Sequence, residues 1–287
     1  MNTLTTELQQ RITEDARNAL LEDTGSGDLT AALVPAEQHA RAHVIVREKA
    51  VICGAPWFNE VFLQLEPGVR INWQCTEGEY AAANSVVCEL QGPAHAILTG
   101  ERSALNFLQT LSATASTARA FVIAVAGTAA TILDTRKTLP GLRLAQKYAV
   151  KTGGAQNHRI GLYDGILIKE NHIVSSGGIK QAVAAALTAR TSAEVLLEVE
   201  VESLAEARDA MQAGVERLLL DNFSQEDMRA AVQMRNQEFA GITLEASGNV
   251  NLDTVKSIAD TGVDFISIGA LTKDIRATDF SMRFEIT

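Results

Sequence analysis

Residues 195–222 decide the fold of this chain of 287 residues, and they read VLLEVEVESLAEARDAMQAGVERLLLDN. An apolar run over 195–201 is followed by a segment of helical pattern and then by a second apolar run over 217–222. The same strand-then-helix unit recurs through the second half of the chain. Its apolar runs are TILD (131–134), DGILIK (164–169), VLLEVEV (195–201), RLLLDN (217–222), ITLEAS (242–247) and FISIG (265–269). Continuous apolar strands that alternate with helices predict a parallel sheet buried on both faces.

Each of these runs closes on a polar residue or a glycine. The closing residues, 22 to 35 positions apart, are Asp134, Lys169, Glu198, Asp221, Ser247 and Gly269. Successive βα units of this length predict an α/β fold with an incomplete or modified (β/α) barrel of about six to seven strands. The chemistry of such barrels lies at the C-terminal ends of the strands, so we expect these six residues to surround a site.

The rest of the chain predicts an α+β N-terminal domain. Apolar residues every four positions from Leu4 to Leu20 predict an amphipathic helix, and short β-like runs with one helix-like piece fill 42–91. Residues 94–125 predict two helices with a break near Ser112. The strict alternation over 280–287 predicts a half-buried strand that returns to this domain. We therefore expect domains over 1–111 plus 275–287 and over 112–274, the second carrying the active site.

Composition narrows the function classes. The formal net charge of −10 argues against nucleic acid or an anionic membrane as the main partner. Three cysteines without CxxC spacing predict neither a disulfide framework nor a zinc site, and they suit a reducing cytoplasm. The first twenty residues lack the pattern of a signal peptide, and the longest apolar stretch, 121–133, is too short to span a bilayer. We expect a cytoplasmic protein.

One window runs against the acidic trend of the chain. Residues 134–172 carry seven Lys or Arg against three acids. Concentrated positive charge costs self-repulsion, so we expect a small ligand with several negative charges to offset it. Three of the cations, Arg143, Lys147 and Lys151, recur every four residues and are interpreted as one solvated helix face. The adjacent pairs Arg136-Lys137 and His158-Arg159 lie in loop-like sequence and are the candidates for binding.

Several residue types in these loops suit anion binding. Arg136 offers a planar fork and Lys137 a point charge, and both follow a strand directly. The glycines and amides of GGAQNHR (153–159) let backbone approach a ligand, although a lone histidine such as His158 is more often structural. Lys169 closes an apolar strand, where it either snorkels to solvent or projects into the barrel mouth. A Schiff-base lysine of the aldolase type therefore remains a second hypothesis.

Carboxylates and small residues close the later strands. Glu198 and Asp221 are candidates to bind Mg²⁺ or ribose hydroxyls, whereas we interpret Glu200 as a helix cap or salt bridge. Small residues beside a helix N-terminus can cradle phosphate with backbone N–H groups. The two predicted phosphate loops are Ser247-Gly248-Asn249 and Ile268-Gly269-Ala270.

These motifs resemble one known family. The segments GERSALNFLQTLSATAS (100–116), DTRKTLPGLR (134–143), KYAVKTGGAQNHRIGLYDGILIKENHI (147–173), LEVEVES (197–203), LLLDN (218–222), EASGNV (245–250) and ISIGALT (266–272) together resemble the quinolinate phosphoribosyltransferase family. The resemblance runs from about residue 22 to 275. It implies a pentosyltransferase of NAD biosynthesis that moves phosphoribose from phosphoribosyl pyrophosphate to quinolinate. The implied products are nicotinate mononucleotide, pyrophosphate and CO2, and the implied cofactor is Mg²⁺.

The resemblance also implies roles for residues. Arg136, His158, Arg159 and Lys169 would hold quinolinate, joined by Arg102 from the partner subunit of a homodimer with shared active sites. Thr135 would line the same substrate site, and Lys137 would meet pyrophosphate. Glu198 and Asp221 would meet the ribose hydroxyls and the metal, directly or through substrate and water, so Lys137, Glu198 and Asp221 form the expected catalytic set. The rival hypotheses are a phosphoribosyltransferase for another pyridine acid, the aldolase-like barrel using Lys169, and a non-catalytic sensor of anionic metabolites.

Overall fold

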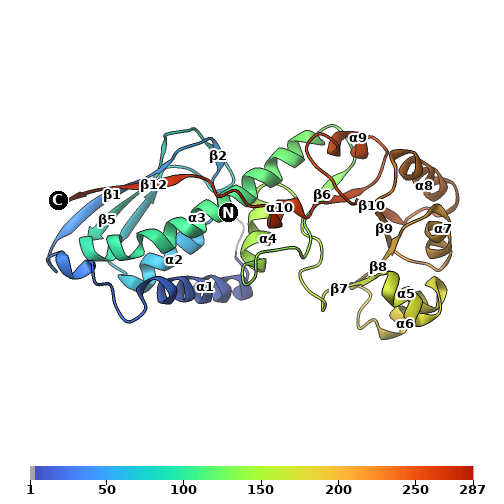
Figure 1. The fold of residues 1–287 in the computed structure, drawn as a ribbon, viewed down its shortest axis with the longest axis horizontal. Helices are drawn as coiled ribbons and strands as arrows, with labels where there is room; N and C mark the ends of the chain where they lie inside the picture. The colour runs from blue at the N-terminus through green and yellow to red at the C-terminus, as the bar shows by residue number, and fades with distance from the viewer. Residues whose placement is uncertain (1–3, 287) are drawn as a thin grey trace. The chain divides into compact units, whose positions relative to one another are not determined.

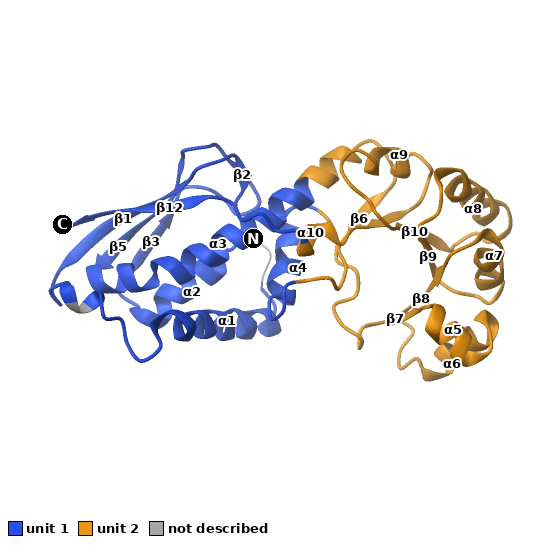
Figure 2. Ribbon diagram, viewed as in Figure 1, with its two compact units in different colours: residues 1–119, 139–154, 274–287 blue, residues 120–138, 155–273 orange. Residues whose placement is uncertain are grey.

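The computed structural model describes residues 4–286, which form two compact units (Figures 1 and 2). The first unit holds the chain up to Arg119 together with 139–154 and 274–287, and the second holds 120–138 and 155–273. Their boundary falls inside one continuous helix, α3 (Ala94–Ala124), so the expected break near Ser112 is wrong. Ser112 instead uses its hydroxyl to bond the backbone N–H and C=O of Cys53, both at 3.0 Å, and tethers the helix.

The first unit is an α+β domain. Its elements are α1 (Thr6–Thr24), η1 (Ala31–Leu33), β1 (His39–Val46), β2 (Ala50–Val51), α2 (Ala55–Leu65), β3 (Arg70–Trp73), β4 (Tyr80–Ala81), β5 (Val86–Pro93), most of α3, α4 (Arg143–Thr152) and β12 (Phe280–Ile286). The main sheet has the order β12-β1-β5-β3 and is antiparallel. Phe280 pairs with Val46 and Ile286 with Ala40, which confirms that the alternating C-terminal strand returns to this domain.

Helix α1 follows from its sequence. Thr5 caps it by accepting the Leu8 N–H at 3.2 Å, and Gly25 ends it at a φ of +51°, which favours glycine. Ile12, Ala16 and Leu20 are buried in the core of the unit, as the spacing of four predicts.

Helix α4 departs from the sequence-based interpretation. Lys147 is only 2% exposed, so a solvated face made of Arg143, Lys147 and Lys151 is wrong at its centre. Ala145, Gln146, Ala149 and Val150 are buried as well, so α4 is covered on more than one face and not only along an apolar stripe. This segment also groups with the first unit, whereas the sequence placed it with the barrel.

The second unit is the expected barrel-like sheet. Its elements are β6 (Thr131–Leu133), β7 (Gly165–Ile168), α5 (Glu170–Ser176), α6 (Ile179–Ala189), β8 (Leu196–Val201), α7 (Leu204–Gln212), β9 (Arg217–Asp221), α8 (Gln225–Glu238), β10 (Thr243–Ser247), α9 (Val255–Ala259), β11 (Phe265–Ser267) and α10 (Ala270–Lys273). The six strands are parallel in the order β6-β11-β10-β9-β8-β7. The sheet curves round an interior with α5 to α9 outside it, which confirms an incomplete (β/α) barrel (Figure 2).

Alternation along the strands gives this sheet an apolar and a polar side. Val199, Val201, Leu218 and Leu220 are fully buried. On β8 Glu198 and Glu200 alternate with these valines, and on β9 Arg217 directly precedes Leu218. A parallel strand covered on both faces tolerates charged side chains only where they are paired, so these residues are expected to have charged or hydrogen-bonding partners. Within residues 4–286, no helix combines the length and apolar character needed to cross a membrane.

Candidate active site

The loop after β6 is tied to the loop before β7 by a buried carboxylate. Asp134 is fully buried and accepts the Asn157 side-chain amide at 2.6 Å and the His158 backbone N–H at 2.9 Å. This tie brings Arg136 beside Arg159. Burial lowers the pKa of Arg159, and the like charge of Arg136 is the next largest cause. Two neighbouring guanidinium groups have the chemistry of an anion site, which is the role that the sequence predicted for these loops.

The guanidinium of Arg159 is held in place by its own loop. Its Nη1 donates to the Gly165 carbonyl at 3.0 Å, and Asp164 accepts the N–H groups of Ile160 and Gly161 at 2.8 and 2.9 Å. A Cβ at Gly165 would lie 3.2 Å from the Arg159 Cβ and 3.4 Å from its Cδ. Glycine at 165 therefore lets the arginine stem lie against the start of β7.

Lys169 follows β7 directly and forms an ion pair with Glu200 on the neighbouring strand. Its backbone N–H donates to Nδ1 of His172 at 3.0 Å, at the start of α5. The pair confirms the interpretation of Glu200 as a salt-bridge residue. The Lys169 side chain is 47% exposed, which is not the desolvated apolar setting of a Schiff-base lysine.

Glu198 does not close its strand. It lies in the middle of β8, three residues before the strand ends at Val201, so the expected strand-end position is wrong. The apolar alternation continues past it because the carboxylate is buried against partners, with its side chain 1% exposed. His158 Nε2 lies 2.9 Å from Glu198 Oε2 and 3.5 Å from Glu245 Oε2. Nδ1 of His158 accepts the Arg159 N–H at 2.7 Å, so both ring nitrogens contact protein groups.

Two charged residues in this cluster escaped the sequence reasoning. Glu245, on β10, is fully buried, and its Oε2 lies 3.5 Å from Nη1 of Arg217. The guanidinium of Arg217 also stacks on the Phe265 ring, 3.9 Å from the ring centroid. Burial raises the pKa of Glu245 to about 8, with the charge of Glu198 as the next cause. Burial likewise raises the pKa of Glu198 to about 7, against the lowering effect of Arg217. The available signal was a charged residue inside the apolar run ITLEAS and another at the start of the run RLLLDN.

The predicted phosphate loop after β10 meets the loop after β9. Asn222 donates its backbone N–H to the Ser247 carbonyl at 2.9 Å, and Asp221 pairs with Ser247 in register. Asn222 and Asn249 adopt φ values of +53° and +47°, and a Cβ at Gly248 would lie 2.1 Å from Asn222 Oδ1. Backbone held in this left-handed region is typical of ligand-binding loops.

A second small-residue loop faces lysine side chains. A Cβ at Gly269 would lie 3.0 Å from Cδ of Lys137 and 3.8 Å from Cε of Lys273. The Thr272 hydroxyl donates to the Lys137 carbonyl at 2.7 Å, while Thr135 Oγ1 accepts the Lys137 N–H at 3.0 Å. Ile268 and Ala270 flank the glycine at the start of α10. Lys273 is a further cation that the sequence reasoning missed.

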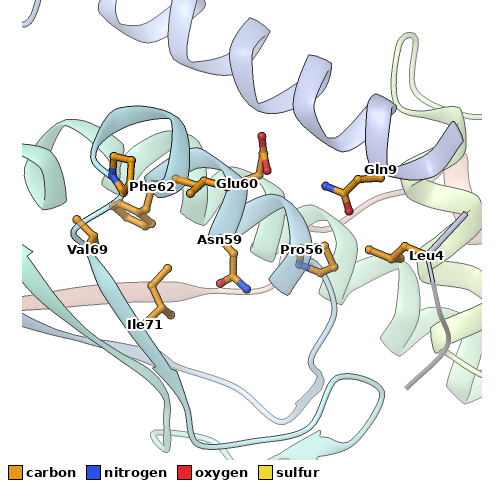
Figure 3. A pocket seen from close by; sticks show the side chains of 10 residues that line it. Leu4, Gln9, Pro56, Asn59, Glu60, Phe62, Val69 and Ile71 are labelled. Atoms are coloured by element: carbon orange, nitrogen blue, oxygen red, sulfur yellow. The ribbon is translucent and has the colours of Figure 1, made fainter. Parts of the chain in front are cut away.

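Two further features belong to the first unit. Arg102 lies on α3 in the first unit, with an exposed side chain, whereas every other predicted site residue belongs to the second unit. The first unit also holds a groove of about 510 Å³ beside α1, α2 and β3 (Figure 3). The groove is lined by Leu4, Gln9, Pro56, Asn59, Glu60, Phe62, Leu63, Pro67, Val69 and Ile71. Because this lining contains a carboxylate and no lysine or arginine, the groove does not suit an anionic ligand.

Comparisons with known proteins agree on one family. Residues 28–112 match the model of the quinolinate phosphoribosyl transferase N-terminal domain, and residues 114–283 match that of its C-terminal domain. The chain is 39% identical to a probable carboxylating nicotinate-nucleotide pyrophosphorylase of Bacillus subtilis, covering 91% of this chain and 89% of the relative. It is also 39% identical to the carboxylating nicotinate-nucleotide pyrophosphorylase of Homo sapiens, covering 88% and 85% of the two chains. The solved structure of a nicotinate-nucleotide pyrophosphorylase from Francisella tularensis matches with a TM-score of 0.93 at 43% identity, covering 99% and 98% of the two chains.

Proposed function

The chain belongs to the quinolinate phosphoribosyltransferase family, and from this premise we propose how its residues divide the work of the reaction. The activity is transfer of phosphoribose from phosphoribosyl pyrophosphate to the ring nitrogen of quinolinate, with loss of CO2. It yields nicotinate mononucleotide and pyrophosphate in NAD biosynthesis. The observation that carries the assignment of residues is the buried Asp134, which ties together the two loops that hold Arg136 and Arg159. Two guanidinium groups that repel one another in the free protein suit a dianion that neutralises both.

The guanidinium pair takes the two adjacent carboxylates of quinolinate. Arg159 is the better fixed of the two, because Gly165 and the Asp164 turn hold its loop. Lys169 adds a third cation and exchanges its partner Glu200 for the ligand. His158 supports this layer from the interior side, since its ring nitrogens face Glu198 and the Arg159 N–H.

The ribose and phosphate side uses the loops after β9, β10 and β11. Lys137, beside Gly269, meets the pyrophosphate, while Ser247, Gly248 and Asn249 offer a turn for the 5′-phosphate. As the bond from the ribose carbon to pyrophosphate breaks, positive charge develops on the ribose, and the carboxylate of Asp221 stabilises it. The pyridine nitrogen forms the new bond. The carbon–carbon bond to the 2-carboxylate then breaks, and its electron pair stays on the ring carbon beside the cationic nitrogen until a proton is taken up.

Magnesium is part of this proposal, and the donor set decides where it fits. In register, Glu198 lies opposite Arg217, and Asp221 stands four residues further along β9, which is about 13 Å of strand. These two carboxylates therefore cannot chelate one ion together. The cluster His158–Glu198–Glu245 has metal-ligand spacing, with its atoms within 4.8 Å, but Arg217 already neutralises it. Asp221, with substrate oxygens and water, is the fitting site, and Mg²⁺ there would neutralise charge on the pyrophosphate.

A homodimer with shared sites completes the proposal. The family resemblance makes Arg102 a quinolinate ligand, and this exposed arginine lies outside the barrel unit. A two-fold interface can lend each Arg102 to the partner's barrel. Mixing inactive Arg102→Ala chains with inactive Lys169→Ala chains should then restore roughly a quarter of wild-type activity, because about half the dimers are hybrids with one intact site of two. A mixture that stays inactive after verified subunit exchange would show that the sites are not shared.

We place the protein in the cytoplasm. Cys53, Cys75 and Cys88 are free thiols, which suits a reducing compartment. Burial raises the pKa of the Cys53 and Cys88 thiols, and this makes them unreactive. Carboxyl-labelled quinolinate tests the activity itself. Labelled CO2 should appear only when phosphoribosyl pyrophosphate is also present, and release without it would exclude the proposed order of bond changes.

A further inference from the structure

A second ionic layer lies beside the guanidinium pair, inside the barrel unit. It consists of Glu198 on β8, Arg217 on β9, Glu245 on β10 and the ring of His158. The side chains of Glu198 and Glu245 are 1% and 0% exposed. The proposed reaction gives Glu245 and Arg217 no work, yet burying two carboxylates and a guanidinium is costly unless they are retained for a purpose.

The hydrogen bonds of His158 fix its protonation. Its Nδ1 accepts the Arg159 N–H at 2.7 Å and therefore carries no proton. The ring proton is then on Nε2, which lies 2.9 Å from Glu198 Oε2 and 3.5 Å from Glu245 Oε2. The imidazole thus joins the backbone of Arg159 on one side to the carboxylate pair on the other.

The carboxylate pair is balanced by few charges. Arg217 lies 3.5 Å from Glu245, and Ser267 of β11 hydrogen-bonds the same carboxylate. The charge of Arg159 lowers the pKa of Glu198, whereas the charge of Glu200 on the same strand raises it. Two ionised carboxylates would leave a net negative charge next to a site for a dianion. Sharing one proton between them leaves a single negative charge, which Arg217 neutralises.

We propose that Glu245, held by Arg217, is a positioning residue for the quinolinate site. It keeps Glu198 against the His158 ring, and the ring in turn fixes the backbone that presents the Arg159 guanidinium. The chain of contacts runs from Arg217 to Glu245 at 3.5 Å, from Glu245 to His158 at 3.5 Å, and from His158 to the Arg159 backbone at 2.7 Å. The proposal rests on the assignment of Arg159 to quinolinate.

Two substitutions at one position test it. Glu245→Leu keeps the volume but removes every hydrogen bond, and it should raise the KM for quinolinate at least tenfold while the KM for phosphoribosyl pyrophosphate stays within twofold. Glu245→Gln keeps an oxygen for Arg217 and His158 and N–H donors for Glu198, so its quinolinate KM should stay within about threefold of wild type. Glu60→Leu is the matched control, because Glu60 is a 9% exposed carboxylate of the first unit, and it should leave both KM values unchanged.

Equal rises in both KM values for Glu245→Leu, or a fall in kcat and thermal stability alone, would reduce Glu245 to a structural residue and overturn the proposal. A second measurement needs no variant that must fold. The ¹⁵N imidazole shifts of the wild-type protein should show His158 as the neutral tautomer with its proton on Nε2 at pH 7. A proton on Nδ1 would break the chain of contacts and refute the proposal. Arg159→Ala separates the two levels: an unchanged quinolinate KM there removes the site assignment and this inference with it, whereas a raised KM beside an unaffected Glu245→Leu removes only the inference.

Discussion

Arg159→Ala removes the better-fixed half of the guanidinium pair. The wild-type side chain already donates from Nη1 to Gly165, so it brings an ordered fork to the ligand and pays little entropy on binding. A hydrogen bond to a charged group contributes about 1.5–3 kcal/mol, and a fork makes two of them. The side chain is only partly buried, and this partial exposure reduces the sum. We expect quinolinate affinity to fall by about 2–4 kcal/mol, or roughly 30- to 900-fold.

Isothermal titration of quinolinate into the free protein measures this loss without turnover. Arg208→Ala is the matched control, because Arg208 forms an exposed ion pair with Glu238 in the same unit and should not affect binding. Circular dichroism checks that both variants fold. A loss below about 0.5 kcal/mol in a folded Arg159→Ala protein would refute the assignment, because a single hydrogen bond to a charged group already contributes about 1.5–3 kcal/mol.

Three further outcomes follow. Asp221→Asn should lower kcat about a hundredfold while quinolinate affinity stays within threefold, because it removes charge from the ribose side; steady-state kinetics that show the reverse would exchange the two halves of the site. Gly248→Ala brings a Cβ to 2.1 Å from Asn222 Oδ1 and should raise the KM for phosphoribosyl pyrophosphate at least about tenfold. Gly241→Ala is the control, because Gly241 has a φ of +100° and open space around it, so this change should lower stability alone. Equal kinetics of the two variants would show that the Gly248 loop does not bind phosphate. The pKa values of Glu198 and Glu245 are raised to about 7 and about 8. Between about pH 4.5 and 8 the folded protein therefore holds more protons than the unfolded chain. The free energy of unfolding should fall as pH rises through this window, by up to about 1.4 kcal/mol per pH unit for each proton. Urea unfolding at pH 5.5 and 7.5 should show a smaller fall in Glu245→Gln, and identical falls would mean that the pair is ionised throughout.

The barrel could be predicted because its strands are short apolar runs that recur along the chain, with a segment of helical pattern after each one. The returning C-terminal strand was equally legible, since Phe280 to Ile286 alternate without exception. The loop positions of Arg136, Lys137 and Arg159 were predictable as well, because the residues around them are typical of loops. Those signals are local in sequence.

The interior of the barrel was less predictable. The predicted position of Glu198 was wrong because a charged residue in an apolar run usually indicates the end of a strand. Here the side chain points into a buried cluster from the middle of β8. Glu245 and Arg217 were missed for the same reason: their partners lie on other strands, and only the register brings them together. Lys147 was taken as solvated because helical spacing says nothing about what packs against a helix.

The central claim is that the Arg136–Arg159 pair recognises two adjacent carboxylates. Equilibrium binding of quinolinate and of nicotinate, its analogue without the 2-carboxylate, tests this claim most directly. Loss of one carboxylate removes at least one charge-assisted interaction of about 1.5–3 kcal/mol, so nicotinate should bind roughly 10- to 150-fold more weakly in the wild-type protein, and the gap should shrink in Arg159→Ala. Equal affinities for the two acids in the wild-type protein would contradict the account.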